Sequence, residues 1–376
     1  MNTRLKVNGV LVSILEGLGD ACLLVDDAGR IVFANGRTRE LFPIPKIIRN
    51  IHLRDVITDS SILGLLEHVA LTGQGMEREF PVQLKIGSRL EDRYLAVNAM
   101  PIDIGGSGGR YMRVLVQDQT ERHATDQVRK DFVANASHEL RTPLSIINGY
   151  LENLVDGVVN DPVQLKKCLL TMRKHGERIA RIVEDMLTLS KFESALDEEG
   201  PHFLRQGTFS CSDCVGDVLE RVASLIESKQ AKVTLKIDRD ADQMAGDRFY
   251  WDQIFFNLIE NALKENGIGV EVQICGERIG RKVVLQVQDN GVGIPREDLP
   301  FVFKSFYRAA KHHSEQIKGT GLGLSIVRRA VEAHGGTITV ESTVGVKTSF
   351  IMEIPDVDLL PEASLVFPAT SGIQSV

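Results

Sequence analysis

The stretch FVANASHELRTPL at residues 132–144 decides how the middle of this chain folds. Two neighbouring helical stripes with a seven-residue spacing run through it and beyond: Val133, Leu140, Ile147 and Leu154, and then Ser137, Leu144, Leu151 and Val158. This spacing is typical of the seam of a coiled coil or four-helix bundle. His138 lies beside the seam, so we expect its imidazole to be reachable from outside.

The neighbours of His138 suit phosphoryl transfer to nitrogen. Glu139 adjoins it, Thr142 follows one turn later, and Pro143 removes a backbone donor and should loosen the helix just past the site. An isolated histidine on a surface helix usually has no chemical role. The sequence SHELRTPL, however, closely resembles the phospho-acceptor box of sensor histidine kinases. Residues 131–136 and 149–152 resemble the branch that includes the phosphate-regulon sensor kinase.

A second amphipathic helix is expected after the turn at Asn160-Asp161-Pro162. Its inward face is predicted to carry Leu165, Leu169, Met172, Ile179, Ile182, Val183, Met186 and Leu189. Two helices with so wide an apolar face cannot bury it alone. We therefore expect a homodimer whose paired hairpins form a four-helix bundle, each buried Leu or Ile contributing about 1.5–3 kcal/mol.

Length and charge limit the possible classes of protein. The chain has 376 residues, enough for two or three domains. Its formal net charge of -7 argues against a direct role in binding nucleic acid. The apolar run that begins at Gly9 stops at Glu16, so we expect no membrane span or signal peptide and a cytoplasmic location. Whether the natural protein has membrane segments beyond this sequence stays open.

The cysteines are Cys22, Cys168, Cys211, Cys214 and Cys275. An odd, scattered set without an export signal predicts reduced thiols. Cys211 and Cys214 have redox or metal-ligand spacing, but an apolar-periodic stretch follows directly. We expect both to be small core residues at the start of a helix, with a redox role as the alternative.

The region 1–120 alternates between strand and helix patterns. Residues 1 to about 18 read as a short helix, and residues 22–35 as a hairpin with its turn at Asp27-Ala28-Gly29 and Asn35 as a helix N-cap. Two further strands, 94–100 and 111–117, flank a glycine-rich loop. With the exit at Asp118 and Thr120, this region resembles a PAS sensor domain.

Two histidines, His52 and His68, lie inside this region and could in principle bind haem or a metal. A lone histidine in a mixed helix is far more often solvated or structural. We therefore predict no ligand role for either, and the signal that the region senses is not readable from the sequence.

The C-terminal region has an α/β pattern. The strands expected at 232–237, 270–276, 282–288 and within 338–354 alternate with a helix at 249–263. On that helix, Asn257 and Asn261 share one face; their carbonyl oxygens can ligate Mg²⁺ and their amides can donate to phosphates. Lys264 adds positive charge one turn on. The stretch 257–264 resembles the N box of histidine kinases, in which an aromatic residue usually follows the lysine; here Glu265 and Asn266 follow.

Asp289-Asn-Gly-Val-Gly-Ile294 directly follows a strand, and Asp-Asn-Gly alone is a common turn. In the fold that it resembles, the aspartate accepts a hydrogen bond from the adenine amine, while Gly291 and Gly293 let the backbone approach the base. Such an acceptor rejects guanine. Ser349 is expected to assist this contact, although nearby Lys347 replaces a glycine frequent in relatives.

Residues 303–308 resemble the F box that anchors a mobile lid, here expected at 309–318. Tyr307 is assigned to the nucleotide site, with a plain core aromatic residue as the alternative. Arg308 can form bidentate bonds with a γ-phosphate. A glycine-rich loop that opens a helix can cradle phosphates through its backbone amides. Its residues are Gly319, Thr320, Gly321, Leu322 and Gly323.

The order of these motifs is similar to that of the ATP-binding domain shared by histidine kinases and clamp-type ATPases. The resemblance implies a multidomain α+β protein: a PAS-like sensor domain at 1–120, a two-helix dimerisation and phospho-acceptor domain at 121–198, an α/β sandwich ATP-binding domain at 199–356, and a flexible tail at 357–376.

The implied activity is autophosphorylation of His138 by ATP and Mg²⁺, with Glu139 as general base or orienting group and Arg308 at the γ-phosphate. The phosphoryl group would pass to an aspartate of a response regulator docked near Ile147 and Tyr150, and Thr142 could orient a water that dephosphorylates the regulator. A clamp ATPase without a phosphoprotein and a scaffold with a decayed nucleotide site are the alternatives.

Overall fold

The computed structural model describes residues 9–45, 48, 50–86, 89–103, 110–197, 204–205, 207–308 and 319–355. The chain divides into two compact units, Met1–Asp131 and Phe132–Val376. The loop at 104–109, the expected lid at 309–318 and the expected tail at 357–376 lie outside the described residues. Within the described ranges, every helix is too short or too polar to cross a lipid bilayer.

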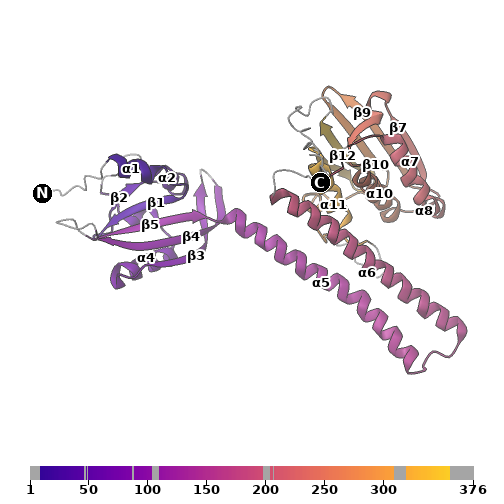
Figure 1. The fold of residues 1–376 in the computed structure, drawn as a ribbon, viewed down its shortest axis with the longest axis horizontal. Helices are drawn as coiled ribbons and strands as arrows, with labels where there is room; N and C mark the ends of the chain where they lie inside the picture. Colours follow the sequence, from indigo (N-terminus) through magenta and orange to yellow (C-terminus); the bar gives the residue numbers. More distant parts are fainter. Residues whose placement is uncertain are drawn as a thin grey trace, which may run out of the picture. The chain divides into compact units, whose positions relative to one another are not determined.

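The first unit is built on one antiparallel five-stranded sheet of order β2-β1-β5-β4-β3 (Figure 1). Its strands are β1 (Ala21–Asp26), β2 (Ile31–Ala34), β3 (Met76–Ile86), β4 (Arg89–Asp103) and β5 (Arg110–Asp118). Its helices are α1 (Gly9–Glu16), α2 (Gly36–Leu41), α3 (Leu53–Val56) and α4 (Ser60–Thr72). The predicted hairpin is confirmed, since β1 and β2 pair antiparallel.

Polar side chains fix the turns of this unit. The carboxamide of Asn35 accepts from the Thr38 and Cys22 amides, both at 3.0 Å, so Asn35 is the predicted N-cap of α2. His52 caps α3 through Nδ1, which accepts from the Arg54 amide, and His68 is exposed on α4. His52 therefore has a structural role as a helix cap, whereas His68 is solvated.

The end of the sheet is tied to the start of the next helix. Asp118 forms an ion pair with Arg93 at 2.9 Å and accepts from the hydroxyl of Thr120. The Tyr94 ring stacks on His123 with centroids 3.7 Å apart. The residues that resemble a PAS exit therefore hold the first turn of the helix against β4.

Two long helices, α5 (Thr120–Val155) and α6 (Pro162–Asp197), supply the predicted hairpin. The part of α5 from Phe132 onward belongs to the second unit. The helix continues through Pro143 without a break, and α6 starts at the predicted proline. Arg178 of α6 donates to Glu139 of α5 at 2.7 Å and so ties the two helices at the level of His138.

The rest of the second unit is a two-layer α/β sandwich. Its main sheet has the order β11-β12-β10-β9-β7, in which only β7 and β9 pair in parallel. The strands are β7 (Lys232–Ile237), β9 (Glu271–Ile279), β10 (Lys282–Asp289), β11 (Thr337–Thr343) and β12 (Lys347–Pro355). A small sheet pairs β6 (Gly207–Ser210) with β8 (Gln243–Gly246).

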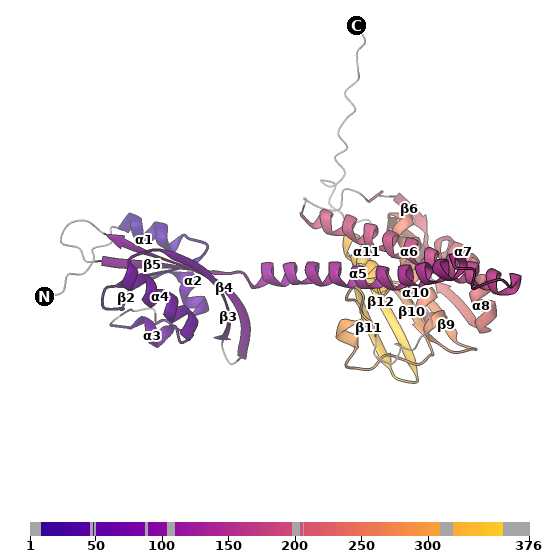
Figure 2. The same cartoon turned by 90° about the horizontal axis from the view of Figure 1, so that it is seen from below.

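Three helices pack on one face of the main sheet: α7 (Cys211–Arg221), α10 (Arg248–Glu265) and α11 (Gly323–Ala333) (Figures 1 and 2). Shorter elements complete the unit, namely α8 (Ala223–Lys229), α9 (Arg239–Asp242) and the 3-10 turn η1 (Leu299–Phe301). The strands and the long helix expected from the sequence are confirmed within a few residues.

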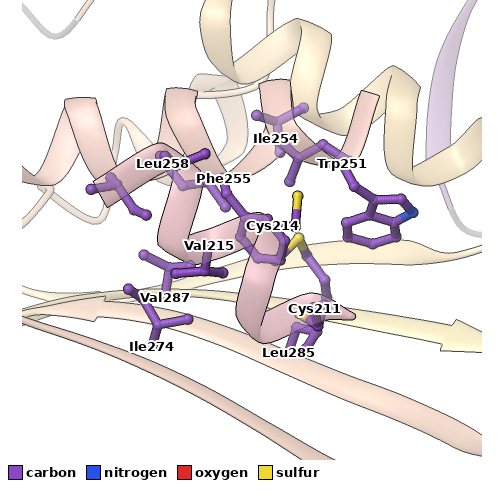
Figure 3. Close-up of a cluster of buried hydrophobic side chains, with 14 of the residues drawn as sticks. Cys211, Cys214, Val215, Trp251, Ile254, Phe255, Leu258, Ile274, Leu285 and Val287 are labelled. Atoms are coloured by element: carbon purple, nitrogen blue, oxygen red, sulfur yellow. The ribbon is translucent and has the colours of Figure 1, made fainter. Parts of the chain in front are cut away.

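The apolar core lies between these helices and the sheet, with Trp251 and Phe255 fully buried among aliphatic side chains (Figure 3). Cys211 and Cys214 are fully buried in the first turn of α7, and burial raises the pKa of the Cys214 thiol to about 11. At this pKa the thiol stays protonated and unreactive. The prediction that both cysteines are core residues is confirmed.

Candidate functional site

A cavity of about 460 Å³ opens beside the C-terminal half of α10. This volume is within the range of sites that bind small molecules. Four motifs that are far apart in the sequence meet here: the asparagine helix, the turn after β10, the segment before residue 309, and the glycine-rich loop. Eleven predicted residues line the cavity: Asn257, Asn261, Lys264, Asp289, Gly293, Tyr307, Arg308, Gly319, Thr320, Gly321 and Gly323.

The asparagine pair on α10 faces the cavity, as its helical spacing predicts. Neither side chain has a hydrogen-bond partner within the described part of the chain, so both amides are available to a ligand. Lys264 also lines the cavity, where its ammonium pairs with Glu260 at 2.7 Å. Across the described ranges, no group of three or more His, Cys, Asp and Glu side chains could hold a metal. Amide oxygens such as those of the asparagine pair, together with the phosphates of a ligand, are oxygen ligands that suit a hard cation.

Asp289 stands at the end of β10 with its carboxyl buried at the cavity wall. Burial raises its pKa, while hydrogen bonds from the Gly291 amide and the Asn266 carboxamide, both at 2.9 Å, oppose that rise. These two bonds occupy Oδ1. The carboxylate is therefore a fixed, buried acceptor at one end of the cavity.

The glycine-rich loop packs too closely for side chains. A Cβ on Gly321, whose φ is +74°, would lie 2.8 Å from Cα of Phe306, and one on Gly323 would lie 2.8 Å from Oδ1 of Asn257. Because α11 starts at Gly323, its first amides lie beside Asn257. The loop thus brings a helix N-terminus, which favours anions, to the asparagine pair.

The segment that ends at Arg308 is anchored by two contacts. The Phe306 amide donates to the Gly321 carbonyl at 2.8 Å, and the Tyr307 hydroxyl donates to Asp298 at 2.6 Å. This leaves the cationic Arg308 at the cavity wall, next to the 309–318 segment outside the described residues.

Three residues that the sequence assigns to the site have other contacts in the structure. Gly291 does not line the cavity; a Cβ there would lie 1.7 Å from Oδ1 of Asn266, so this glycine makes room for Asn266. Leu322 is fully buried against Leu189 and Ile326. Its amide donates to the Thr320 hydroxyl and is not available to a phosphate.

Ser349 is the third residue that has other contacts than the sequence suggests. In the strand register Asp289 lies opposite Thr348, and successive side chains point to opposite faces of the sheet. Thr348 therefore lines the cavity, whereas Ser349 accepts from Gln286 at 2.6 Å on the other face.

The second helix of the hairpin forms part of the wall, which the sequence did not predict. Arg181, Glu184 and Asp185 of α6 all line the cavity. The Thr320 hydroxyl donates to Asp185 at 2.9 Å, and burial raises the pKa of this carboxyl to about 6. Arg181 pairs with Glu260 at 3.6 Å. Below these contacts, Leu189 and Met186 of α6 pack on Leu322 and Ile326.

His138 is exposed on α5, on a different element from the cavity residues, as its position beside the seam predicts. Thr142 is also exposed, and its hydroxyl donates to the His138 carbonyl at 3.3 Å. Glu139 is half-buried in its ion pair with Arg178. The imidazole is therefore accessible, with a carboxylate held in place beside it.

Two family models match the chain. Residues 128–195 match the His Kinase A (phospho-acceptor) domain, and residues 246–358 match the histidine kinase-, DNA gyrase B- and HSP90-like ATPase. The sensor protein SrrB of Staphylococcus aureus strain MRSA252 is 28% identical over 358 residues, which are 91% of this chain and 55% of that protein. The chain spans about half the length of the curated relatives that it matches.

Solved structures of histidine kinases are also similar. AdeS of Acinetobacter baumannii is 29% identical with a TM-score of 0.47, over 58% of this chain and 97% of that one. ThkA, in complex with the response regulator TrrA, is 25% identical with a TM-score of 0.49, over 92% and 98%. The two family models show that the chain carries a His Kinase A (phospho-acceptor) domain followed by a histidine kinase-, DNA gyrase B- and HSP90-like ATPase domain.

Proposed function

We propose that this chain phosphorylates His138 with Mg-ATP and passes the phosphoryl group to an aspartate of a response regulator. The observation that carries the proposal is the meeting of four separate motifs around one cavity, in a chain that also exposes His138 within a matched phospho-acceptor domain. In the transfer, an imidazole nitrogen forms a bond to the γ-phosphorus, the bond to the β,γ-bridging oxygen breaks, and ADP leaves.

Each end of the cavity suits one part of the nucleotide. Asp289 accepts from the adenine amine, and the first amides of α11 bind phosphate oxygens. Asn257 and Asn261 would hold Mg²⁺, which neutralises phosphate charge when bound. Arg308 stabilises the γ-phosphate, and Glu139, held by Arg178, takes up the proton released from the attacking imidazole.

The direct test is incubation of the chain with ATP labelled at either the γ- or the α-phosphate. We expect stable label from the γ position only, lost in acid and retained in alkali, as for a phosphohistidine. Hydrolysis without labelled protein would indicate a clamp-type ATPase, and no binding of Mg-ATP to residues 200–356 would indicate a scaffold. Either outcome would reject the proposal.

The homodimer is a further part of the proposal. Leu144 and Leu151 are 51% and 43% exposed although they occupy the predicted seam, and Leu169 of α6 is 50% exposed. A second copy of the hairpin would cover these side chains. Such an apolar stripe at heptad spacing fits the same stripe of an identical chain.

Leu151→Glu is expected to weaken the dimer at least about 100-fold, because burial of an apolar side chain is lost in both copies. Sedimentation equilibrium of the full chain measures this. Asn148→Glu is the matched control, since it adds the same charge one helical turn away, outside the seam, and should leave the dimer intact. A Leu151→Glu chain that dimerises like the wild type would contradict the dimer proposal.

Asp185 gives the site a pH dependence. Burial raises its pKa to about 6, against the opposing hydrogen bond from Thr320, so the buried carboxyl binds its proton more tightly than a solvated one does. The stabilisation from this group is complete below about pH 4 and is lost as the pH rises through about 6. Above about pH 6, the Asp185 carboxylate is charged and faces the part of the cavity in which we expect the phosphates.

Asp185→Asn keeps an acceptor for Thr320 and removes the charge. We expect it to lower the Kd for Mg-ATP about fivefold at about pH 8 and to have little effect near pH 5. Calorimetric titration at both pH values measures the change. Glu177→Gln, on the same helix but outside the cavity, should match the wild type. Equal affinities of the Asp185→Asn and wild-type chains at about pH 8 would contradict this account.

The input and output of the kinase complete the proposal. A PAS-type sensor is supported by the strand order β2-β1-β5-β4-β3 and by the Asp118 and Thr120 exit. Response-regulator docking near Ile147 and Tyr150, and dephosphorylation assisted by Thr142, follow from the acceptor-box resemblance, as does a phosphate-responsive signal. Phosphotransfer profiling against candidate receiver domains would identify the partner.

A further inference from the structure

Asn266, at the C-terminal end of α10, is a buried carboxamide whose donor and acceptor groups are both used. The side chain is only 6% exposed. Its Nδ2 donates to Asp289 Oδ1 at 2.9 Å and to the Ala262 carbonyl at 2.8 Å. Its Oδ1 accepts from the Val292 amide at 2.8 Å. One side chain thus joins the end of α10 to both ends of the turn after β10.

The turn is built around this carboxamide. Gly291 can have no side chain because a Cβ would overlap Asn266, and the Gly291 amide adds a second donor to Asp289 Oδ1. With Oδ1 occupied by two donors, Oδ2 is the oxygen that remains for a ligand in the cavity. The rotation of the Asp289 carboxyl is therefore set by Asn266 together with the Gly291 amide.

The same bonds decide whether Asp289 accepts or donates. Burial raises its pKa, and only the Gly291 and Asn266 hydrogen bonds act against burial. Lys229 donates to the Asn266 carbonyl at 2.5 Å. The other charged groups on the packed elements include Glu260, Lys264 and Glu265 of α10, which line the cavity, and Glu271 of β9, whose amide donates to Asn290 in the turn. None of them contributes to the pKa shift of Asp289.

An ionised carboxylate and a protonated carboxyl prefer different bases. Adenine presents an exocyclic amine, which needs an acceptor, whereas guanine presents a carbonyl oxygen at the same position, which needs a donor. A buried donor that faces another donor, or a buried acceptor that faces another acceptor, weakens binding because it loses its hydrogen-bond partner. We propose that Asn266 is the positioning residue that keeps Asp289 an oriented, ionised acceptor and thereby sets the preference for adenine over guanine. This inference rests on the proposed function, because it assumes that the cavity binds ATP.

The test replaces Asn266 with Asp in the full chain. Asn266→Asp keeps nearly the same shape and the acceptor for Val292, but removes the donor and adds a carboxyl against Asp289. We expect the Kd for Mg-ATP to rise about 30-fold near neutral pH and the ratio of GTP to ATP Kd values to fall at least about tenfold. The affinity for ATP should then increase with pH over a range in which the wild type is constant.

Two further variants make the result decisive. Asn290→Asp makes the same substitution one residue beyond Asp289, at an exposed side chain that does not line the cavity, and should keep the wild-type ratio and pH profile. Asn266→Ala removes the donor without adding charge. It should also lower the ratio of GTP to ATP Kd values. If Asn266→Asp does not fold, Asn266→Ala tests the inference in its place.

Three results would overturn the inference. The first is a folded Asn266 variant whose ratio of GTP to ATP Kd values and whose pH profile of ATP affinity both equal those of the wild type. The second is an equal loss of ATP and GTP affinity at every pH, which would indicate a purely structural role. The third is failure of the wild-type chain to bind Mg-ATP. That result would overturn the proposed function as well and so differs from a failure of the inference alone.

Discussion

His138→Gln is expected to abolish acid-labile labelling of the chain by γ-labelled ATP, a loss of at least about 100-fold. Glutamine keeps the length and polarity of the side chain but has no nitrogen nucleophile. His138 is exposed and does not line the nucleotide cavity. Mg-ATP affinity and thermal stability should therefore stay close to those of the wild type. The measurement is retention of label on the denatured chain after alkaline washing.

The matched control for this prediction is His68→Gln, which makes the same change at an exposed histidine of α4 in the first unit. It should label like the wild type. Undiminished label in His138→Gln would show that another residue accepts the phosphoryl group and would reject the assignment of the acceptor.

Asp289→Asn should raise the Kd for Mg-ATP about 100-fold or more. Asn266 Nδ2 and the Gly291 amide both donate to Oδ1, so the new side chain must keep its oxygen there and turn its NH₂ toward the cavity. A donor then faces the adenine amine, which is also a donor. Two donors that face each other lose a hydrogen bond, and the loss of binding free energy is comparable to that of a substrate analogue that lacks the group for which the site was built.

Equilibrium binding of a fluorescent ATP analogue to the full chain measures this loss, with competition by unlabelled ATP. Asp213→Asn, at an exposed carboxylate of α7, is the control and should have no effect. A Kd within about threefold of the wild type for a folded Asp289→Asn chain would remove Asp289 from the site.

The sequence predicts the scaffold well where one local rule decides the structure. The heptad seam around His138 identifies the helix and its exposed histidine, and the i, i+4 spacing puts Asn257 and Asn261 on one face. The Cys211 and Cys214 pair is correctly assigned to the core because apolar periodicity follows it. In each case the neighbours in the sequence are also the neighbours that matter in space.

The sequence is less informative where a contact depends on register or on a distant element. Thr348 rather than Ser349 faces the cavity because the pairing of β12 with β10 fixes the phase of the strand, and a shift of one residue reverses every side chain. Leu322 lies among glycines that suggest phosphate binding, but it packs on Leu189 from α6. No sequence pattern near Leu322 predicts its contact with Leu189.

The role of the second hairpin helix in the cavity wall could not be predicted for the same reason. Asp185 and Thr320 are 135 residues apart in the sequence, yet their side chains are hydrogen-bonded. Asn266 shows a different limit. Its neighbour Glu265 replaces the usual aromatic residue after Lys264, but the three side-chain bonds of Asn266 become visible only when α10 and the turn after β10 are packed together.

The most direct test of the central claim is to locate the phosphoryl group. The wild-type chain, incubated with Mg-ATP and digested at alkaline pH, should yield one acid-labile phosphopeptide by mass spectrometry, with the modification on His138. The same digest of a chain carrying Asp289→Asn should yield almost none. Phosphate on any other residue, or equal phosphorylation of His138 in the Asp289→Asn chain, would contradict the account.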